Sequence, residues 1–102
     1  MKEETLYKPA NQILKLMTRK SSVDSALPLA MKDWLRLKIW ERQVQVKEFE
    51  KKYGMTFEKY ETACLDGQIK DPYSYEVEKD GWEWEALITE IEDFEEMSQW
   101  LA

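Results

Sequence analysis

The strongest helical signal in the chain is the stretch PLAMKDWLRLKIWERQVQVKEFEKKY, residues 28–53. Pro28 suits the first turn of a helix, because the N–H that proline lacks would have no partner there. Gly54 follows the stretch and favours the left-handed conformation that ends many helices. The pattern therefore predicts a helix from Pro28 to Tyr53, roughly 39 Å long at 1.5 Å per residue.

The two halves of this helix have different apolar patterns. The second half narrows to the stripe Val46, Phe49 and Tyr53, with charged residues between. The first half is apolar nearly all round, and such a helix is expected to be buried on all faces. The predicted length also exceeds what a domain of this size needs for its own core. The apolar residues of the first half are Leu29, Ala30, Met31, Trp34, Leu35, Leu37, Ile39 and Trp40.

Two shorter helices flank the long one. Over residues 9–20, Ala10, Ile13, Leu14 and Met17 follow the i, i+3, i+4, i+7 spacing of one helical face. A strand through Gln12–Thr18 is the alternative. Residues 56–66 form the other helix, which has Thr56 as its N-cap and Gly67 at its end. Its apolar face combines Phe57 and Tyr60 with Cys64, which we expect to be buried and inert.

A final helix is predicted over residues 80–101, with Asp80 as its N-cap. Before it, residues 68–79 form a connector that contains a turn at Asp71–Pro72 and a short extended stretch over Tyr73–Val77. The fold expected is all-α, a single helical domain over residues 1–102. The apolar seam of the final helix comprises Trp84, Leu87, Ile91, Phe94, Ser98 and Leu101, at coiled-coil-like spacings.

The charge of the chain is unevenly distributed. The net charge is −6, yet residues 71–102 alone carry eleven acidic residues and one lysine. This end would repel phosphates and favours a basic protein partner.

Charged residues reach 35%, mostly Lys and Glu, an enrichment typical of thermophiles. No apolar run approaches the ~20 residues of a membrane span, no signal peptide is visible and Cys64 has no disulfide partner, so we expect a cytoplasmic protein with no membrane partner.

Several chemistries lack the residues that they need. The chain has no histidine, one cysteine and three glycines, so it offers no histidine base, cysteine zinc cluster or phosphate-binding glycine loop. The acidic residues between Asp71 and Glu85 do not match the calcium-loop spacing. We therefore expect no enzyme activity, no cofactor and no metal.

The five tryptophans are the best candidates for partner contacts. Trp82 and Trp84 point about 200° apart on a helix, so both cannot face one core. Trp84 fits the core seam, whereas Trp82 and Trp100 lie off it and favour an interface. Trp34 and Trp40 also diverge, and for them an internal core is an equal alternative.

A mildly basic segment lies near the N-terminus. Its candidate nucleic-acid contacts are Lys15, Arg19 and Lys20, with Lys8 nearby. Base-reading side chains are not interleaved among them, so a solvated face is favoured and nucleic acid is an unlikely partner.

The order FEKKYGM, TFEKY, glycine and DGWEWEAL, over roughly residues 47–90, resembles small acidic proteins of archaea and some bacteria. Some of these look like antitoxin-type partners of a small toxin. The resemblance implies a neutralising subunit, with Trp82, Trp84, Glu83 and Glu85 as contacts. This chain departs from the shortest such proteins by about 46 additional N-terminal residues.

Together these patterns predict a non-catalytic protein–protein interaction module, antitoxin-like, that binds a small basic protein. Two alternatives remain open. One is a structural protein that assembles only with itself as a homo-oligomer. The other is a DNA-binding regulator that uses the basic segment.

Overall fold

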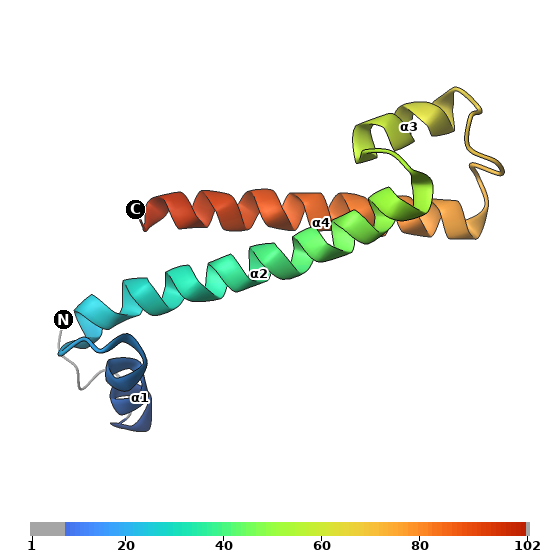
Figure 1. Cartoon of the computed structure of the whole chain (residues 1–102). Helices are drawn as coiled ribbons and strands as arrows, with labels where there is room; N and C mark the ends of the chain where they lie inside the picture. Colours follow the sequence, from blue (N-terminus) through green and yellow to red (C-terminus); the bar gives the residue numbers. More distant parts are fainter. Residues whose placement is uncertain (1–7, 102) are drawn as a thin grey trace.

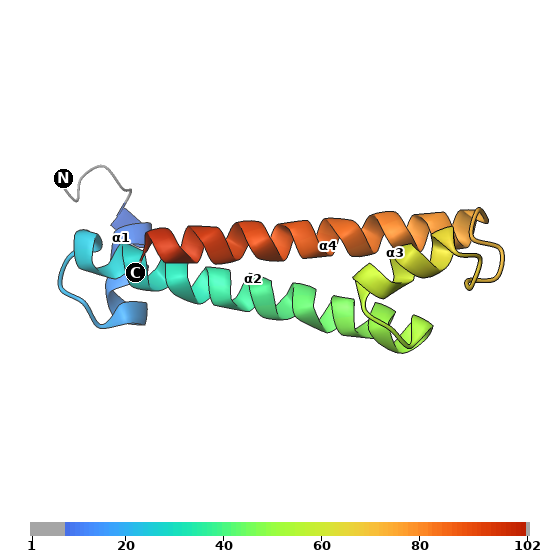
Figure 2. The ribbon, with the colours of Figure 1, turned by 90° about the horizontal axis from the view of Figure 1, so that it is seen from above.

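The computed structural model describes residues 8–101, and this part of the chain is all-α, as predicted. The helices are α1 (Lys8–Thr18), α2 (Val23–Tyr53), α3 (Phe57–Leu65) and α4 (Tyr75–Trp100). Helices α2 and α4 form a long antiparallel hairpin (Figure 1 and Figure 2), and the molecule measures 59 Å in its largest dimension. We call the end where α3 joins them the closed end, and the end that carries α1 the open end.

Helix α2 begins five residues earlier than predicted, so the assignment of Pro28 to its first turn is wrong. Ser22 is the N-cap, and its hydroxyl accepts a hydrogen bond from the backbone N–H of Ser25 at 3.2 Å. The added turn is stabilised by burial, because Val23 and Ala26 are almost completely covered. Gly54 ends the helix in the left-handed conformation, with φ 70°, as predicted.

Helix α4 also begins earlier than predicted, at Tyr75, so Asp80 is not its N-cap and Tyr73–Val77 is not extended. Ser74 caps the helix by accepting from the N–H of Val77 at 3.3 Å. The first turn contains Glu76 and Glu78, whose charges favour a helix N-terminus. The turn expected at Asp71–Pro72 is present just before this cap.

The two short helices are confirmed in type. Thr56 caps α3, and the strand alternative for Gln12–Thr18 is wrong because α1 spans these residues. The predicted inward face of α1 does not pack as expected, since Ile13 and Met17 are 54% and 68% exposed. Helix α1 lies on the opposite side of α2 from α4 (Figure 1), so it cannot close the groove between the two long helices.

The core follows the seam between α2 and α4, where Trp84 and Leu87 are buried and Ile91 is half-buried, as predicted. The first half of α2, in contrast, is not buried on all faces. Trp34, Leu37 and Trp40 are each more than half exposed. Only α4 and the short α1 pack against this half of α2 among the described residues, and two neighbours cannot surround a helix.

Candidate protein-binding surface

An aromatic cluster fixes the closed end. Trp84 is fully buried and stacks on Phe49 from α2 at a centroid distance of 5.5 Å. Three further rings surround it, because α3 folds back over the hairpin and brings Phe57 and Tyr60 to within 5.4 and 5.1 Å, beside Tyr53. Ring pairs of this kind add about 0.5–1.5 kcal/mol each beyond the buried area. The cluster therefore holds the first turns of α4 in a fixed orientation.

Asp80 forms a buried polar link in the same region. Its Oδ2 accepts hydrogen bonds from Lys52 Nζ and from the Tyr53 hydroxyl, each at 2.6 Å. Although burial acts to raise the pKa of Asp80, these two donors hold it below its ordinary value. Hydrogen bonds to Asp80 and to Glu76 raise the pKa of Lys52. Burial and then the bond to Asp80 raise the pKa of Tyr53. At neutral pH Asp80 is therefore ionised, Lys52 is charged and Tyr53 is neutral.

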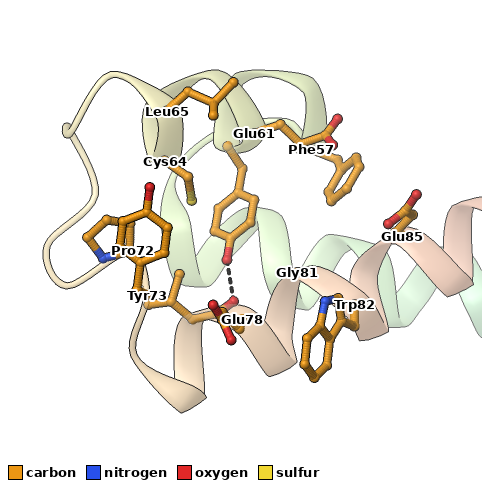
Figure 3. A pocket seen from close by; sticks show the side chains of 12 residues that line it. Phe57, Glu61, Cys64, Leu65, Pro72, Tyr73, Glu78, Gly81, Trp82 and Glu85 are labelled. Atoms are coloured by element: carbon orange, nitrogen blue, oxygen red, sulfur yellow. Dashed lines mark hydrogen bonds between the residues drawn. The ribbon is translucent and has the colours of Figure 1, made fainter.

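A groove of about 360 Å³ lies between α3 and the first turns of α4 (Figure 3). Tyr60 lines this groove and donates to the carbonyl of Val77 at 2.6 Å, and Cys64 lines the same groove. Burial, then the neighbouring Cys64, raises the pKa of Tyr60 to about 12. Cys64 is half-buried rather than fully buried. Over residues 8–101, no group of three His, Cys, Asp or Glu side chains is placed to hold a metal ion.

The most extended candidate surface is the side of α4 that faces away from α2. Trp82 and Trp100 are 64% and 73% exposed. They are eighteen residues apart, which is about five turns, so they share one side of the helix roughly 27 Å apart. The same helical spacing places exposed acidic residues between and beside them. We call this surface the outer acidic face: Glu78, Trp82, Glu85, Glu92, Asp93, Glu96 and Trp100.

The charges of the outer acidic face have no counter-ion among the described residues. Other acidic residues of α4 are paired, for example Glu90 with Arg42 at 2.7 Å and Glu83 with Lys79 at 3.5 Å. Helix α4 carries ten acidic residues and a single lysine. The resulting negative potential attracts cationic partners and repels phosphates. Sequence reasoning missed Glu78, Glu92, Asp93 and Glu96, although the five-turn spacing of the two tryptophans was a usable signal.

The structure separates the predicted contact residues. Trp82, Glu85 and Trp100 lie together on the outer acidic face, whereas Glu83 points to its side toward Lys79. Trp84 is 0% exposed, so its assignment as a partner contact is wrong and its place in the core seam is confirmed.

Trp34 and Trp40 lie on α2 instead. Trp34 meets Phe94 edge to face at 5.7 Å, and Trp40 is 60% exposed. Trp34 therefore belongs partly to the hairpin seam, while Trp40 lies on another surface of the molecule.

The basic segment does not form one exposed cationic face on α1. Lys15 is half-buried, while Arg19 and Lys20 are exposed in the turn that follows the helix. Arg19 adopts a left-handed backbone conformation, with φ 58°, at the point where α1 ends.

Comparison of the chain with protein-family models, curated proteins and solved structures found no match. The resemblance to antitoxin-type proteins therefore stays a prediction. None of the described helices is long and apolar enough to cross a membrane.

Proposed function

We propose that the chain is a non-catalytic module that binds a basic protein through the outer acidic face of α4, in the manner of an antitoxin-like neutralising partner. The observation that carries the proposal is the alignment of Trp82 and Trp100, along roughly 27 Å of one helix, with acidic residues that have no counter-ion in the part of the chain that the structure describes. Exposed tryptophans supply apolar anchors, and the carboxylates select the charge of the partner.

The rest of the molecule supports this surface. The aromatic cluster and the Asp80 group hold α4 rigidly at the closed end, so less conformational entropy is lost when a partner docks. A basic helix of about five turns matches the length of the face.

The test is affinity purification of the tagged full chain from the cells that produce it, at low and at high salt. We expect a stoichiometric basic protein that is lost above ~0.5 M salt, where charges are strongly screened. The double variant Trp82→Ala, Trp100→Ala should lose it, and Trp40→Ala should retain it, because Trp40 has similar exposure on a different helix. Recovery of the same partner by the double variant would contradict the proposal.

A further inference from the structure

Helix α2 carries a second exposed surface, on the side that faces away from α4. Leu37, Trp40 and Val44 are 51%, 60% and 38% exposed and follow one another in steps of three and four residues. We call these three residues the outer stripe of α2. Trp40 is about 200° around the helix from Arg42, which faces α4 through its bond to Glu90.

The outer stripe continues an interface that already exists in the molecule. The same spacing, extended toward the N-terminus, reaches Val23 and Ala26, which are 2% and 0% exposed. Helix α1 packs on this side of α2 and covers only the first part of it (Figure 1). Past α1 the repeat is interrupted by the exposed Asp33 and resumes at Leu37, with no covering helix among the described residues.

Charge decides which partner suits this stripe. Helix α2 carries seven basic and five acidic residues, in contrast to the strongly acidic α4. If two copies docked through α4, the ten acidic residues of one α4 would lie against the ten of the other, and the two helices would repel each other. Pairing through α2 instead leaves the two α4 helices on opposite outer sides, beyond the ~8 Å over which salt screens charge at physiological strength.

We propose that two copies of the chain pair antiparallel through the outer stripe of α2, about a two-fold axis beside position 42. In antiparallel pairing, the alternating three- and four-residue steps of one helix interleave with those of the other. Trp40 then packs on Val44 of the second copy, and Leu37 lies along the aliphatic stem of Lys47. Asp33 faces Lys51 at both ends of the interface.

This register uses most of α2 beyond the part that α1 covers. Position 33 pairs with position 51, so α2 of the second copy ends, at Tyr53, opposite Met31, five residues after the buried Ala26. The paired length is roughly 27 Å, which is short for a stable interface. We therefore expect a dimer with a micromolar dissociation constant. It leaves the outer acidic face of each copy open, so it is independent of the proposed function.

Sedimentation equilibrium of the full chain tests the dimer. We expect Trp40→Glu to raise the dissociation constant at least about 100-fold, because the residue enters the interface twice. Trp82→Glu is the matched control, since its 64% exposure is similar and its helix is different; it should leave the dimer unchanged. Circular dichroism confirms that both variants keep their helices.

Charge exchange tests the register. Asp33→Lys should weaken the dimer about tenfold, and adding Lys51→Asp should restore it to within about threefold. Among the described residues, the ion-pair partner of Asp33 in the single chain is exposed Arg36, at 3.3 Å, so we expect the exchange to leave the fold intact. A wild-type chain that stays monomeric at millimolar concentration would overturn the proposal. So would a dimer that survives Trp40→Glu but is lost with Trp100→Glu, or one that the second substitution fails to restore.

Discussion

The closed and open ends of the hairpin both carry large apolar side chains, but these side chains are buried to very different extents. At the closed end, Trp84 and Tyr60 are 0% and 3% exposed. At the open end, Trp34 and Met31 are 52% and 48% exposed although they line a groove of about 310 Å³ between the same two helices. The difference comes from the short helix at each end. At the closed end α3 folds over the two long helices, whereas at the open end α1 lies on the side of α2 that faces away from α4.

An apolar helix face beside the α2–α4 seam is buried only where a third element covers it. Two packed helices each bury one stripe, and side chains beside that stripe remain in water unless another element covers them. The closed end therefore supplies stability and orientation. The open end supplies apolar surface that is available to other molecules.

Truncating the closed-end cluster should give the largest effect. Trp84→Ala removes a fully buried indole and should lower the free energy of unfolding by about 3–5 kcal/mol. Urea denaturation followed by far-UV circular dichroism measures the change. Trp34→Ala at the open end is the matched control and should cost about 1 kcal/mol, because the indole is already half in water and loses an edge-to-face contact with Phe94 and a cation–π contact with Lys38. Equal losses would contradict the comparison.

Removing the Asp80 charge should have a smaller effect. Asp80→Asn keeps the shape of the side chain but weakens its bonds to Lys52 and Tyr53. Because Lys52 is 44% exposed, solvent reduces the contribution, and we expect a loss of about 1–2 kcal/mol in the same denaturation experiment. Glu78→Gln, on the exposed side of α4, should change stability by less than about 0.5 kcal/mol. Equal effects of the two variants would show that Asp80 is not a structural link.

The hydrogen-bonded group of Asp80, Lys52 and Tyr53 also predicts that the free energy of unfolding depends on pH. The pKa of Asp80 is lower in the folded state, so its contribution is complete above the ordinary carboxyl value of about 3.9 and is lost as pH falls through the folded-state pKa. The raised pKa values of Lys52 and Tyr53 give a contribution that is complete below about pH 10 and is lost above it.

The measurement is the stability difference between wild type and Asp80→Asn from acid to alkaline pH. This difference cancels the relief of repulsion among the other carboxylates of α4. We expect a plateau between about pH 5 and pH 9, with a decline on both sides. A difference that stays constant into strong acid would contradict the Asp80 assignment.

The smallest expected effect is a gain in stability. Gly81 lies inside α4, and a Cβ added there would meet the Tyr60 ring at 3.4 Å, an ordinary contact. Gly81→Ala should therefore raise the free energy of unfolding by up to about 1 kcal/mol through helix propensity. Gly54→Ala is the opposite case, because φ is 70° there and an alanine is strained. Thermal unfolding of the two variants should give midpoint shifts of opposite sign.

Sequence reasoning recovered what depends on local chemistry. The helical class, the Thr56 cap and the Gly54 terminus follow from side chains that act on their own backbone. It misplaced the starts of α2 and α4, because Pro28 and Asp80 carry strong start signals, whereas the N-caps are the earlier serines Ser22 and Ser74. Asp80 serves instead as the acceptor for Lys52.

The surface was harder to predict for a related reason. An apolar residue in a sequence pattern does not show whether another element will cover it. Trp82 and Trp84 were separated correctly by helical geometry, but the exposure of Leu37 and Trp40 depends on how far along α2 the helix α1 reaches. The position of α1 on α2 is set by packing and cannot be read from the spacing within either helix.

The distribution of the tryptophans gives the protein an intrinsic optical signal. Trp84 is shielded from water, while the indoles of Trp34, Trp40, Trp82 and Trp100 are more than half exposed. A small neutral quencher should therefore reach four emitters and leave one protected. Each proposed contact would cover a different pair of rings, Trp82 and Trp100 for a basic partner or the two copies of Trp40 for self-pairing. Fluorescence of the unlabelled chain can thus follow either association, and single tryptophan-to-phenylalanine variants can assign the signal to one surface.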